Sequence, residues 1–127
     1  MEIGIQNGFV DLLIDAVGYS SNTGATYMIF GHNGTWVASK NASGVGTSVS
    51  GVKLIGDSDS YSGNSVSNGG DVNADSIDDF VIGGPIASPQ VRANAGRAWI
   101  VFGRNETGNW TGMMNLKTLT LPDGVAK

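Results

Sequence analysis

The most informative part of the sequence runs from Asp71 to Gly103. It begins with the run DVNADSIDDFVIGGP and ends with the run AWIVFG. Oxygen-bearing side chains occupy the first, third, fifth and ninth places of the opening loop, at Asp71, Asn73, Asp75 and Asp79. The seventh residue, Ile77, is placed to offer its backbone carbonyl. Because Ca²⁺ takes about six to eight oxygen ligands, this spacing suits a hard cation.

The residues after the loop indicate strands rather than helices. An EF-hand loop is followed by a long amphipathic helix, whereas here the loop passes into Phe80–Ile82, which is aromatic and β-branched. The breaker Gly83-Gly84-Pro85 then ends the apolar run. The loop is therefore expected to join two strands.

These parts together resemble the FG-GAP repeat of integrin-type β-propellers. That repeat has an Asp-rich calcium loop, an apolar strand, a Gly-Ala-Pro turn and a later Phe-Gly, and the corresponding segments here are 71–79, 80–82, 83–85 and 102–103. The resemblance implies an all-β fold of propeller-type blades built from short antiparallel strands. It also implies a Ca²⁺ ion held by Asp71, Asn73, Asp75, Ile77 and Asp79, and an extracellular or cell-surface role of the kind that integrin alpha-like adhesion proteins have. The family usually has Gly where Ala74 and Ser76 stand.

A second interpretation of the loop needs no ion. Similar spacings occur in surface turns, where Asp and Asn side chains accept hydrogen bonds from their own backbone. Asp79 at the ninth place and the strand and Gly-Gly-Pro that follow favour the calcium interpretation.

Composition fits a small β domain. The chain has 127 residues, 20 glycines and only 14% charged residues, which suits short strands and many turns. Its formal net charge of −4 argues against a nucleic-acid surface. It has no cysteine, so disulfides and thiolate metal sites are excluded. The first residues show no signal peptide, and no segment has the length and apolarity of a membrane span.

The sequence repeats itself. Residues 22–31 match residues 94–103 at an offset of 72, which places Phe30-Gly31 over Phe102-Gly103. Upstream, Asp11–Ile14 matches Asp79–Ile82 at an offset of 68, so the second copy has four extra residues in between. We therefore expect one domain, residues 1–127, with a degenerate first repeat at about 1–50 and a second repeat with the calcium loop at 51–127.

The first copy of the loop has lost half of its oxygens. The places of Asp71, Asn73, Asp75, Ile77 and Asp79 are held by Ile3, Ile5, Asn7, Phe9 and Asp11. Two of the four side-chain oxygen donors are missing. We do not expect this copy to hold calcium by itself.

Six strands are predicted, at residues 9–16, 24–30, 51–56, 63–68, 79–84 and 97–103. The connection 31–50 is predicted to be irregular, with Trp36-Val37 as its only apolar anchor. Four aromatic residues recur at matched places in the two copies and are expected in the core: Tyr27, Phe30, Trp99 and Phe102. Trp36 and Trp110, in the connections, are better candidates for an exposed binding aromatic than these four, although burial is the expectation for each.

Such a chain supplies fewer than two complete blades, whereas a propeller closes with about four to eight. We therefore expect a head-to-tail homo-oligomer, in which three chains would supply six blades. The competing explanation is that the chain is a fragment of a longer protein.

The leading functional hypothesis is a non-catalytic calcium-binding propeller module that binds a protein or a glycan. A propeller-based hydrolase or lyase is the first alternative, but His32 is the only histidine and falls in a loop. A purely structural assembly unit with no small ligand is the second. No catalytic residue is assigned.

Overall fold

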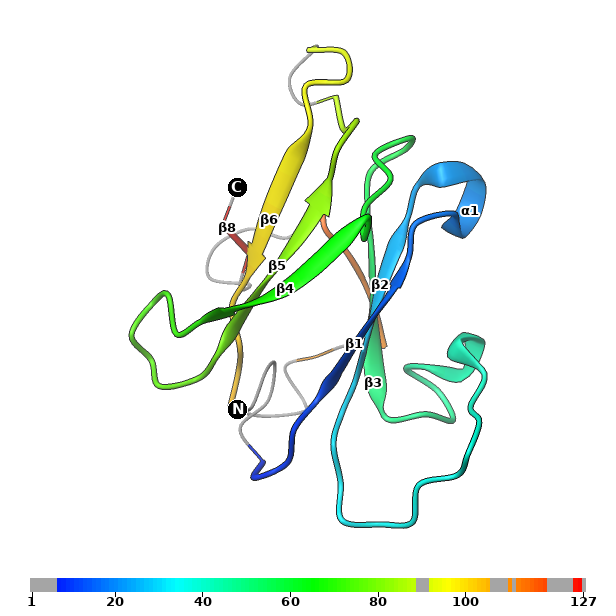
Figure 1. The fold of residues 1–127 in the computed structure, drawn as a ribbon, viewed down its shortest axis with the longest axis vertical. Helices are drawn as coiled ribbons and strands as arrows, with labels where there is room; N and C mark the ends of the chain where they lie inside the picture. The colour runs from blue at the N-terminus through cyan, green and yellow to red at the C-terminus, as the bar shows by residue number, and fades with distance from the viewer. Residues whose placement is uncertain (1–6, 89–91, 106–109, 111, 119–124, 127) are drawn as a thin grey trace.

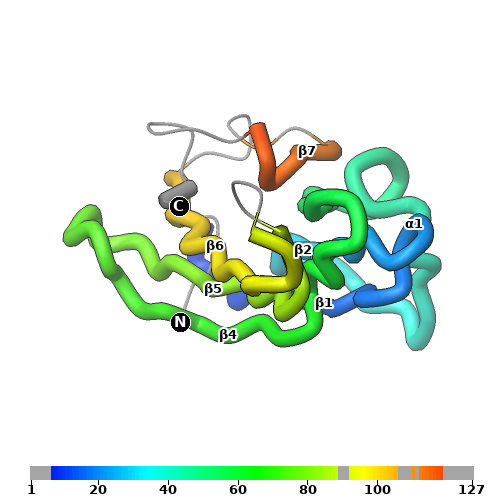
Figure 2. The backbone as a smooth tube through the Cα atoms, turned by 90° about the horizontal axis from the view of Figure 1, so that it is seen from above, coloured from blue at the N-terminus to red at the C-terminus, as the bar shows by residue number. Residues whose placement is uncertain are grey.

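Two four-stranded sheets pack against each other in the computed structural model (Figures 1 and 2). The structure describes residues 7–88, 92–105, 110, 112–118 and 125–126. The first sheet has the strand order β1-β2-β3-β7, with β1 Leu12–Ala16, β2 Ala25–Ile29, β3 Gly51–Ile55 and β7 Met113–Asn115. The second has the order β4-β5-β6-β8, with β4 Ser65–Gly70, β5 Asp79–Gly84, β6 Arg97–Val101 and β8 Val125–Ala126. The all-β expectation of short blade-like sheets is confirmed.

Five of the six predicted strands contain an observed one, and the sixth, 63–68, overlaps β4, which runs two residues further to Gly70. Antiparallel pairing joins all neighbours except β3 and β7, which are parallel. The two short helical segments are α1 Tyr19–Asn22 and the 3₁₀ turn η1 Ala42–Gly44. In α1 the residues Ser20–Asn22 have positive φ, so this segment is a left-handed turn rather than a regular helix. Among the described residues no helix is long and apolar enough to cross a membrane.

The strand register repeats between the sheets as the sequence offsets require. Ile14 pairs with Tyr27 in the first sheet, and Ile82 pairs with Trp99 in the second. The connection between β1 and β2 covers residues 17–24, and that between β5 and β6 covers residues 85–96. The second connection is thus four residues longer, as the change in offset predicts.

The main core lies between the two sheets. It contains Met28, Val52 and Leu54 from the first sheet and Phe80, Ile82, Trp99 and Val101 from the second, all 0% exposed. Alternate residues of a strand face opposite sides of the sheet, so one side of each sheet supplies this core. Of the four recurring aromatics, Tyr27, Phe30 and Trp99 are buried and Phe102 is half-buried.

A second, smaller core lies on the outer side of the first sheet. Tyr27 and Ile29 pack there with Val45 and Val49 from the connection between β2 and β3. The expectation that Trp36-Val37 anchors this connection is wrong, because both side chains are exposed. The connection turns back at η1, where the side chain of Asn41 accepts a hydrogen bond from Ser43 N–H, and this turn brings Val45 to the sheet.

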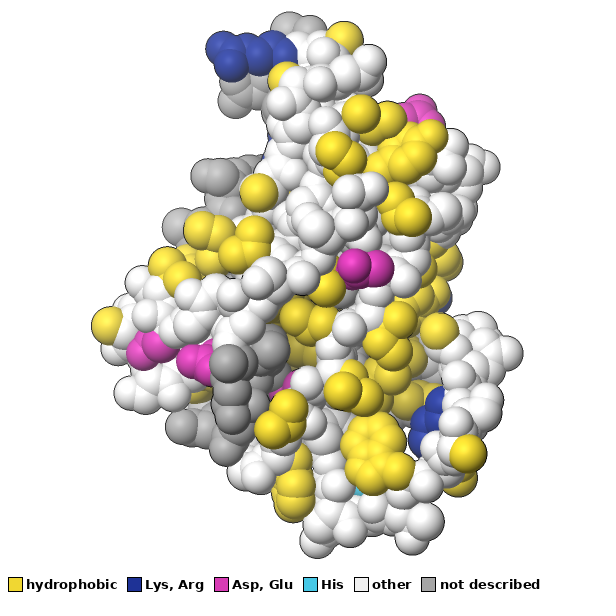
Figure 3. All heavy atoms as spheres, in the orientation of Figure 1, with side chains coloured by type: hydrophobic (Ala, Val, Ile, Leu, Met, Phe, Trp, Pro, Cys, Tyr) yellow, Lys and Arg dark blue, Asp and Glu magenta, His cyan; other side chains and the backbone are white. Residues whose placement is uncertain are grey.

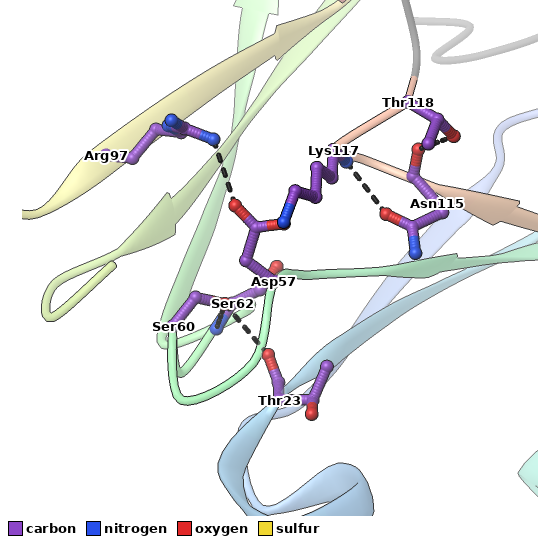
Figure 4. Close-up of polar contacts among 8 residues, drawn as sticks. All are labelled: Thr23, Asp57, Ser60, Ser62, Arg97, Asn115, Lys117 and Thr118. Atoms are coloured by element: carbon purple, nitrogen blue, oxygen red, sulfur yellow. Dashed lines mark hydrogen bonds and ion pairs between the residues drawn. The ribbon is translucent and has the colours of Figure 1, made fainter. Parts of the chain in front are cut away.

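A turn after β3 ties the two sheets together through polar contacts (Figure 4). Asp57 forms an ion pair with Arg97 of β6 at 3.0 Å, and Lys117, beyond β7, lies 4.0 Å from its other oxygen. The hydroxyl of Ser60 donates to the carbonyl of Thr23 at 2.9 Å. The turn thereby links the end of the first sheet to the start of the second.

The sheet boundaries do not coincide with the repeat boundary expected near residue 50. β3 follows that boundary in sequence but is the third strand of the first sheet. Within the second sheet β8 lies beside β6 as β3 lies beside β2. Three strands of each sheet therefore match, and in the described part of the chain β4 has no counterpart in the first sheet and β7 has none in the second.

Candidate metal site

The oxygen-rich loop 71–79 joins β4 to β5 and projects away from the first sheet (Figure 1). β4 ends in a register shift between Asn68 and Gly70, and Gly70 has a φ of +69° that turns the chain into the loop. Residues 71–76 are exposed, whereas Ile77 and Asp79 are buried. The loop thus has an open outer part and a base fixed in the core.

Backbone amides of the loop point at the acidic side chains. Oδ1 of Asp71 accepts from Asp75 N–H at 3.0 Å, and Oδ2 of Asp71 accepts from Ser76 N–H at 2.8 Å. Oδ1 of Asp75 accepts from Ile77 N–H at 2.8 Å. Asn73 takes part through its own Oδ1, which accepts from Asp75 N–H at 3.1 Å, and its Nδ2, which donates to Asp75 Oδ2 at 2.9 Å. The three side chains Asp71, Asn73 and Asp75 are therefore brought together, in the pattern of overlapping turns that Asp and Asn form with their own backbone.

Two residues of the loop adopt left-handed backbone conformations. Ala74 has a φ of +62° and Ser76 a φ of +71°. These are the two places where the resemblance expects Gly. A residue with a Cβ is strained by about 1 kcal/mol in this region of φ. The curved path of the loop therefore comes with backbone strain at Ala74 and Ser76.

Asp79 ties the base of the loop to the far end of β6. Its side chain is fully buried, with Oδ2 accepting from Val72 N–H at 2.8 Å and Oδ1 accepting from Gly103 N–H at 2.9 Å. A buried carboxylate is costly unless its oxygens are satisfied, and both are satisfied here. A Cβ on Gly103 would collide with the side chain of Ile77 and would lie 2.6 Å from the carbonyl of Asp78. The close approach of Gly103 to the loop thus requires glycine.

The three carboxylates Asp71, Asp75 and Asp79 do not converge as the sequence predicts. Across the described residues no three Asp, Glu, His or Cys side chains form a potential metal-ligand group. The physical reason is that Asp79 turns both oxygens toward backbone amides of Val72 and Gly103.

The donor chemistry nevertheless fits a hard cation. Asp71, Asn73 and Asp75 all offer oxygen acceptors in the loop, although Nδ2 of Asn73 donates to Asp75. A carboxylate has about four lone-pair sites, so the two N–H bonds that each Asp accepts leave capacity for an ion. Closing the shell around Ca²⁺ would add the Ile77 carbonyl and an oxygen of Asp79.

Comparison with known families finds a match over part of the chain. Residues 62–101 match the model of the FG-GAP repeat. This segment is an FG-GAP repeat. It spans β4, the oxygen-rich loop, β5 and β6, which is the part of the chain where the sequence resemblance is strongest. No curated protein matches the chain.

The first copy retains two contacts of the FG-GAP loop. Oδ1 of Asp11, which is 4% exposed, accepts from Gly31 N–H at 2.8 Å, as Asp79 does from Gly103. Oδ1 of Asn7 accepts from Phe9 N–H at 2.9 Å, as Asp75 does from Ile77. Ile3 and Ile5 lie outside the described residues. The degenerate copy thus keeps the strand tie of the FG-GAP repeat.

The role of Gly103 and Gly31 was not found by sequence reasoning, although the recurring Phe-Gly pair was its signal. The glycine matters because its N–H donates to the buried carboxylate and because a Cβ has no room. A Cβ on Gly31 would collide with the carbonyl of Val10 and would lie 2.7 Å from Cβ of Phe9. Both glycines therefore close the same turn.

Outside the FG-GAP loop, an exposed aromatic pair is the clearest candidate for ligand contact. His32 and Trp36 stack with ring centroids 4.5 Å apart and planes at 11°. Trp36 is 44% exposed, so part of its surface remains accessible beside the stacked imidazole. Trp110 is buried and lies over the core beside Phe80, with Arg104 4.7 Å from its ring centroid. Of the two tryptophans considered, Trp36 is the exposed one.

Proposed function

We propose that this chain is a calcium-binding FG-GAP repeat module of β-propeller type that binds a protein or a glycan and has no catalytic role. The observation that carries the proposal is the loop 71–79, in which Asp71, Asn73 and Asp75 gather oxygen donors above a buried Asp79. Ca²⁺ would be held by these side chains and by the Ile77 carbonyl. The ion would supply positive charge and coordination to oxygen, and no reaction step is assigned to it.

The residues of the loop explain why such an ion would stabilise the fold. Asp71 and Asp75 are brought together by shared backbone contacts, so their like charges repel across the loop. A cation removes that repulsion. Because Asp79 already connects the loop base to Gly103, ordering the loop also braces the end of β6 against β5.

Melting curves in calcium and in a chelator test this part of the proposal. At an ion concentration 100-fold above the dissociation constant, binding stabilises the fold by about 2.7 kcal/mol. We expect a higher melting temperature in calcium for the wild-type chain and no difference for Asp75→Ala. Asp59→Ala, in an exposed turn, is the matched control and should keep the difference. Superimposable wild-type curves in the two buffers count against the calcium site.

The binding role is supported by the exposed pair His32 and Trp36. Aromatic faces pack on apolar faces of sugars and of protein side chains, and function in repeat folds commonly lies in such loops. The imidazole of His32 accepts Gly34 N–H at Nδ1, at 3.0 Å, which gives this histidine a local structural partner rather than a catalytic one.

A glycan array with the wild-type chain and Trp36→Ala tests the binding role. The array is expected to show glycan binding that Trp36→Ala abolishes while Val37→Ala, an exposed neighbour, keeps it. A general hydrolase panel run beside it should show no turnover. Turnover that survives purification would overturn the non-catalytic assignment.

A further inference from the structure

The contact between the two sheets defines which surfaces of this chain fit one another. The second sheet contributes Phe80 and Ile82 from β5 and Trp99 and Val101 from β6, and each is 0% exposed. The first sheet covers them with the side that carries Leu13 of β1, Met28 of β2 and Leu54 of β3. The side of the second sheet that carries Phe80 and Ile82 thus packs on the side of the first sheet that carries Leu13. Under the repeat, these two sides are opposite sides of equivalent sheets.

The repeat relates the buried side of the second sheet to an open side of the first. At the offset of 68, Phe80 and Ile82 correspond to Leu12 and Ile14, which are 47% and 42% exposed. We call this side of β1 the Leu12 face. Hydrophobic side chains gather over β1 in the middle of the view in Figure 3. On this side of the first sheet, Val45 and Val49 of the segment 42–49 cover β2. The same segment leaves Leu12 and Ile14 of β1 exposed.

The repeat also relates the buried side of the first sheet to an open side of the second. Leu13 and Met28 correspond to Val81 and Ile100, which are only half-buried. We call this side the Ile100 face, and its central residues are Ser65, Ser67, Val81, Gly83, Ala98 and Ile100. Most of them are small, so another sheet can approach closely.

We propose that the Leu12 face of one chain docks on the Ile100 face of a second copy of the same chain. The repeat relates each open face to a face that is buried between the two sheets of one chain. The contact between two chains would therefore have the same geometry as the contact between the two sheets. The Leu12 face and the Ile100 face are different surfaces, so the association is head-to-tail. Each pair of chains then has one unused Leu12 face at one end and one unused Ile100 face at the other. The inference does not rest on calcium binding or on the exposed aromatic pair.

One further feature supports the same occupant. β5 has β4 along one edge, whereas among the described residues no strand lies along the matching edge of β1. An open strand edge with exposed apolar side chains is a template for association with another chain. A second copy placed on the Leu12 face would shield this edge.

Sedimentation velocity over a concentration series tests the proposal with two exposed positions. Leu12→Lys places a charge on the Leu12 face, and Ala98→Lys places one on the Ile100 face. We expect the wild-type chain to associate with increasing concentration, each variant alone to sediment as a monomer, and an equimolar mixture of the two variants to form a pair. The mixture pairs because the intact Leu12 face of Ala98→Lys meets the intact Ile100 face of Leu12→Lys.

Controls separate this interface from folding defects and from other contacts. Val37→Lys changes an exposed apolar residue in the connection between β2 and β3, which belongs to neither face, and should associate as the wild-type chain does. Circular dichroism of every variant should show the wild-type strand signal, and Ile100→Ala serves as a second variant if Ala98→Lys does not fold. A wild-type chain that stays monomeric at every concentration overturns the proposal. Self-association of Ala98→Lys alone would also overturn it, because it would indicate a symmetric contact. Calcium binding by a monomer would leave the proposed function standing while the docking inference fails.

Discussion

Oδ1 of Asp79 accepts a hydrogen bond from the backbone N–H of Gly103 at 2.9 Å, across the gap between the start of β5 and the end of β6. The first repeat builds the same contact between Asp11 and Gly31 at 2.8 Å. Only the second repeat retains the full set of loop oxygens, so the tie does not depend on them. The ninth residue of the loop therefore fixes the strands in both repeats.

Replacing Asp11 should weaken the fold independently of calcium. Hydrogen bonds to charged groups contribute about 1.5–3 kcal/mol, and Asp11→Asn retains an acceptor but loses the charge, so we expect a loss of about 1–2 kcal/mol. Urea unfolding in chelator measures it. Asp59→Asn, in an exposed turn, should stay within about 0.5 kcal/mol of the wild-type chain. Equal stability of Asp11→Asn and the wild-type chain would show that the tie is dispensable.

Relieving the strain at Ala74 should stabilise the chain. Its φ of +62° is a region that glycine occupies at little cost, so Ala74→Gly should gain up to about 1 kcal/mol, measured in chelator. Gly70 has a φ of +69°, and a Cβ added there would meet no atom within 4 Å. Gly70→Ala therefore measures the cost of placing alanine at positive φ without a steric clash. It should lose about 1 kcal/mol. A destabilised Ala74→Gly would mean that the loop does not adopt this backbone.

The two glycines before Pro85 should respond differently to alanine. A Cβ on Gly84 would lie 2.8 Å from the buried ring of Trp99 and 3.0 Å from the carbonyl of Ser60, neither of which can move freely. Gly84→Ala should therefore cost about 1–3 kcal/mol, as overpacking of a core does. A Cβ on Gly83 meets the hydroxyl of Ser65, an exposed side chain that can rotate, so Gly83→Ala should cost less. Thermal melts of both variants at one low concentration test the order.

Stability should depend on pH through Asp15. Asp15 is exposed, but partial desolvation of its carboxyl raises the pKa above the ordinary value of 3.8, so the folded chain holds this proton to a higher pH than the unfolded chain does. The contribution of Asp15 to stability therefore falls as the pH rises from 3.8 through the raised pKa, and it stays at the lower level above that pKa. Asp15→Asn should be more stable than the wild-type chain at neutral pH, with the difference shrinking toward acid pH. Parallel unfolding curves of the two proteins at every pH would contradict this.

The strands were predictable because their signals are local. Apolar runs such as Phe80–Ile82 lie between turn residues, and the two offsets of the repeat fix which strands correspond. The register confirms this, since Ile14 pairs with Tyr27 as Ile82 pairs with Trp99. The burial of Tyr27 and Trp99 followed from their matched places.

The contacts that depend on the path of a loop were not predictable from the sequence. Trp36 looked like an anchor because it is large and apolar, but η1 brings Val45 and Val49 to the sheet instead. The spacing of the acidic residues indicated convergence, yet it could not show that Asp79 turns toward Val72 and Gly103. The direction of a side chain at a loop base is set by amides distant in sequence.

Calorimetric titration of the chain with CaCl₂ tests whether the loop 71–79 binds calcium. We expect saturable binding of one ion per chain, because the first loop has lost two of its oxygen donors, and we expect Asp75→Ala to abolish the binding while Asp11→Asn keeps it. A titration without binding heat at any temperature, or one that saturates equally in Asp75→Ala, would rule out a calcium site in this loop.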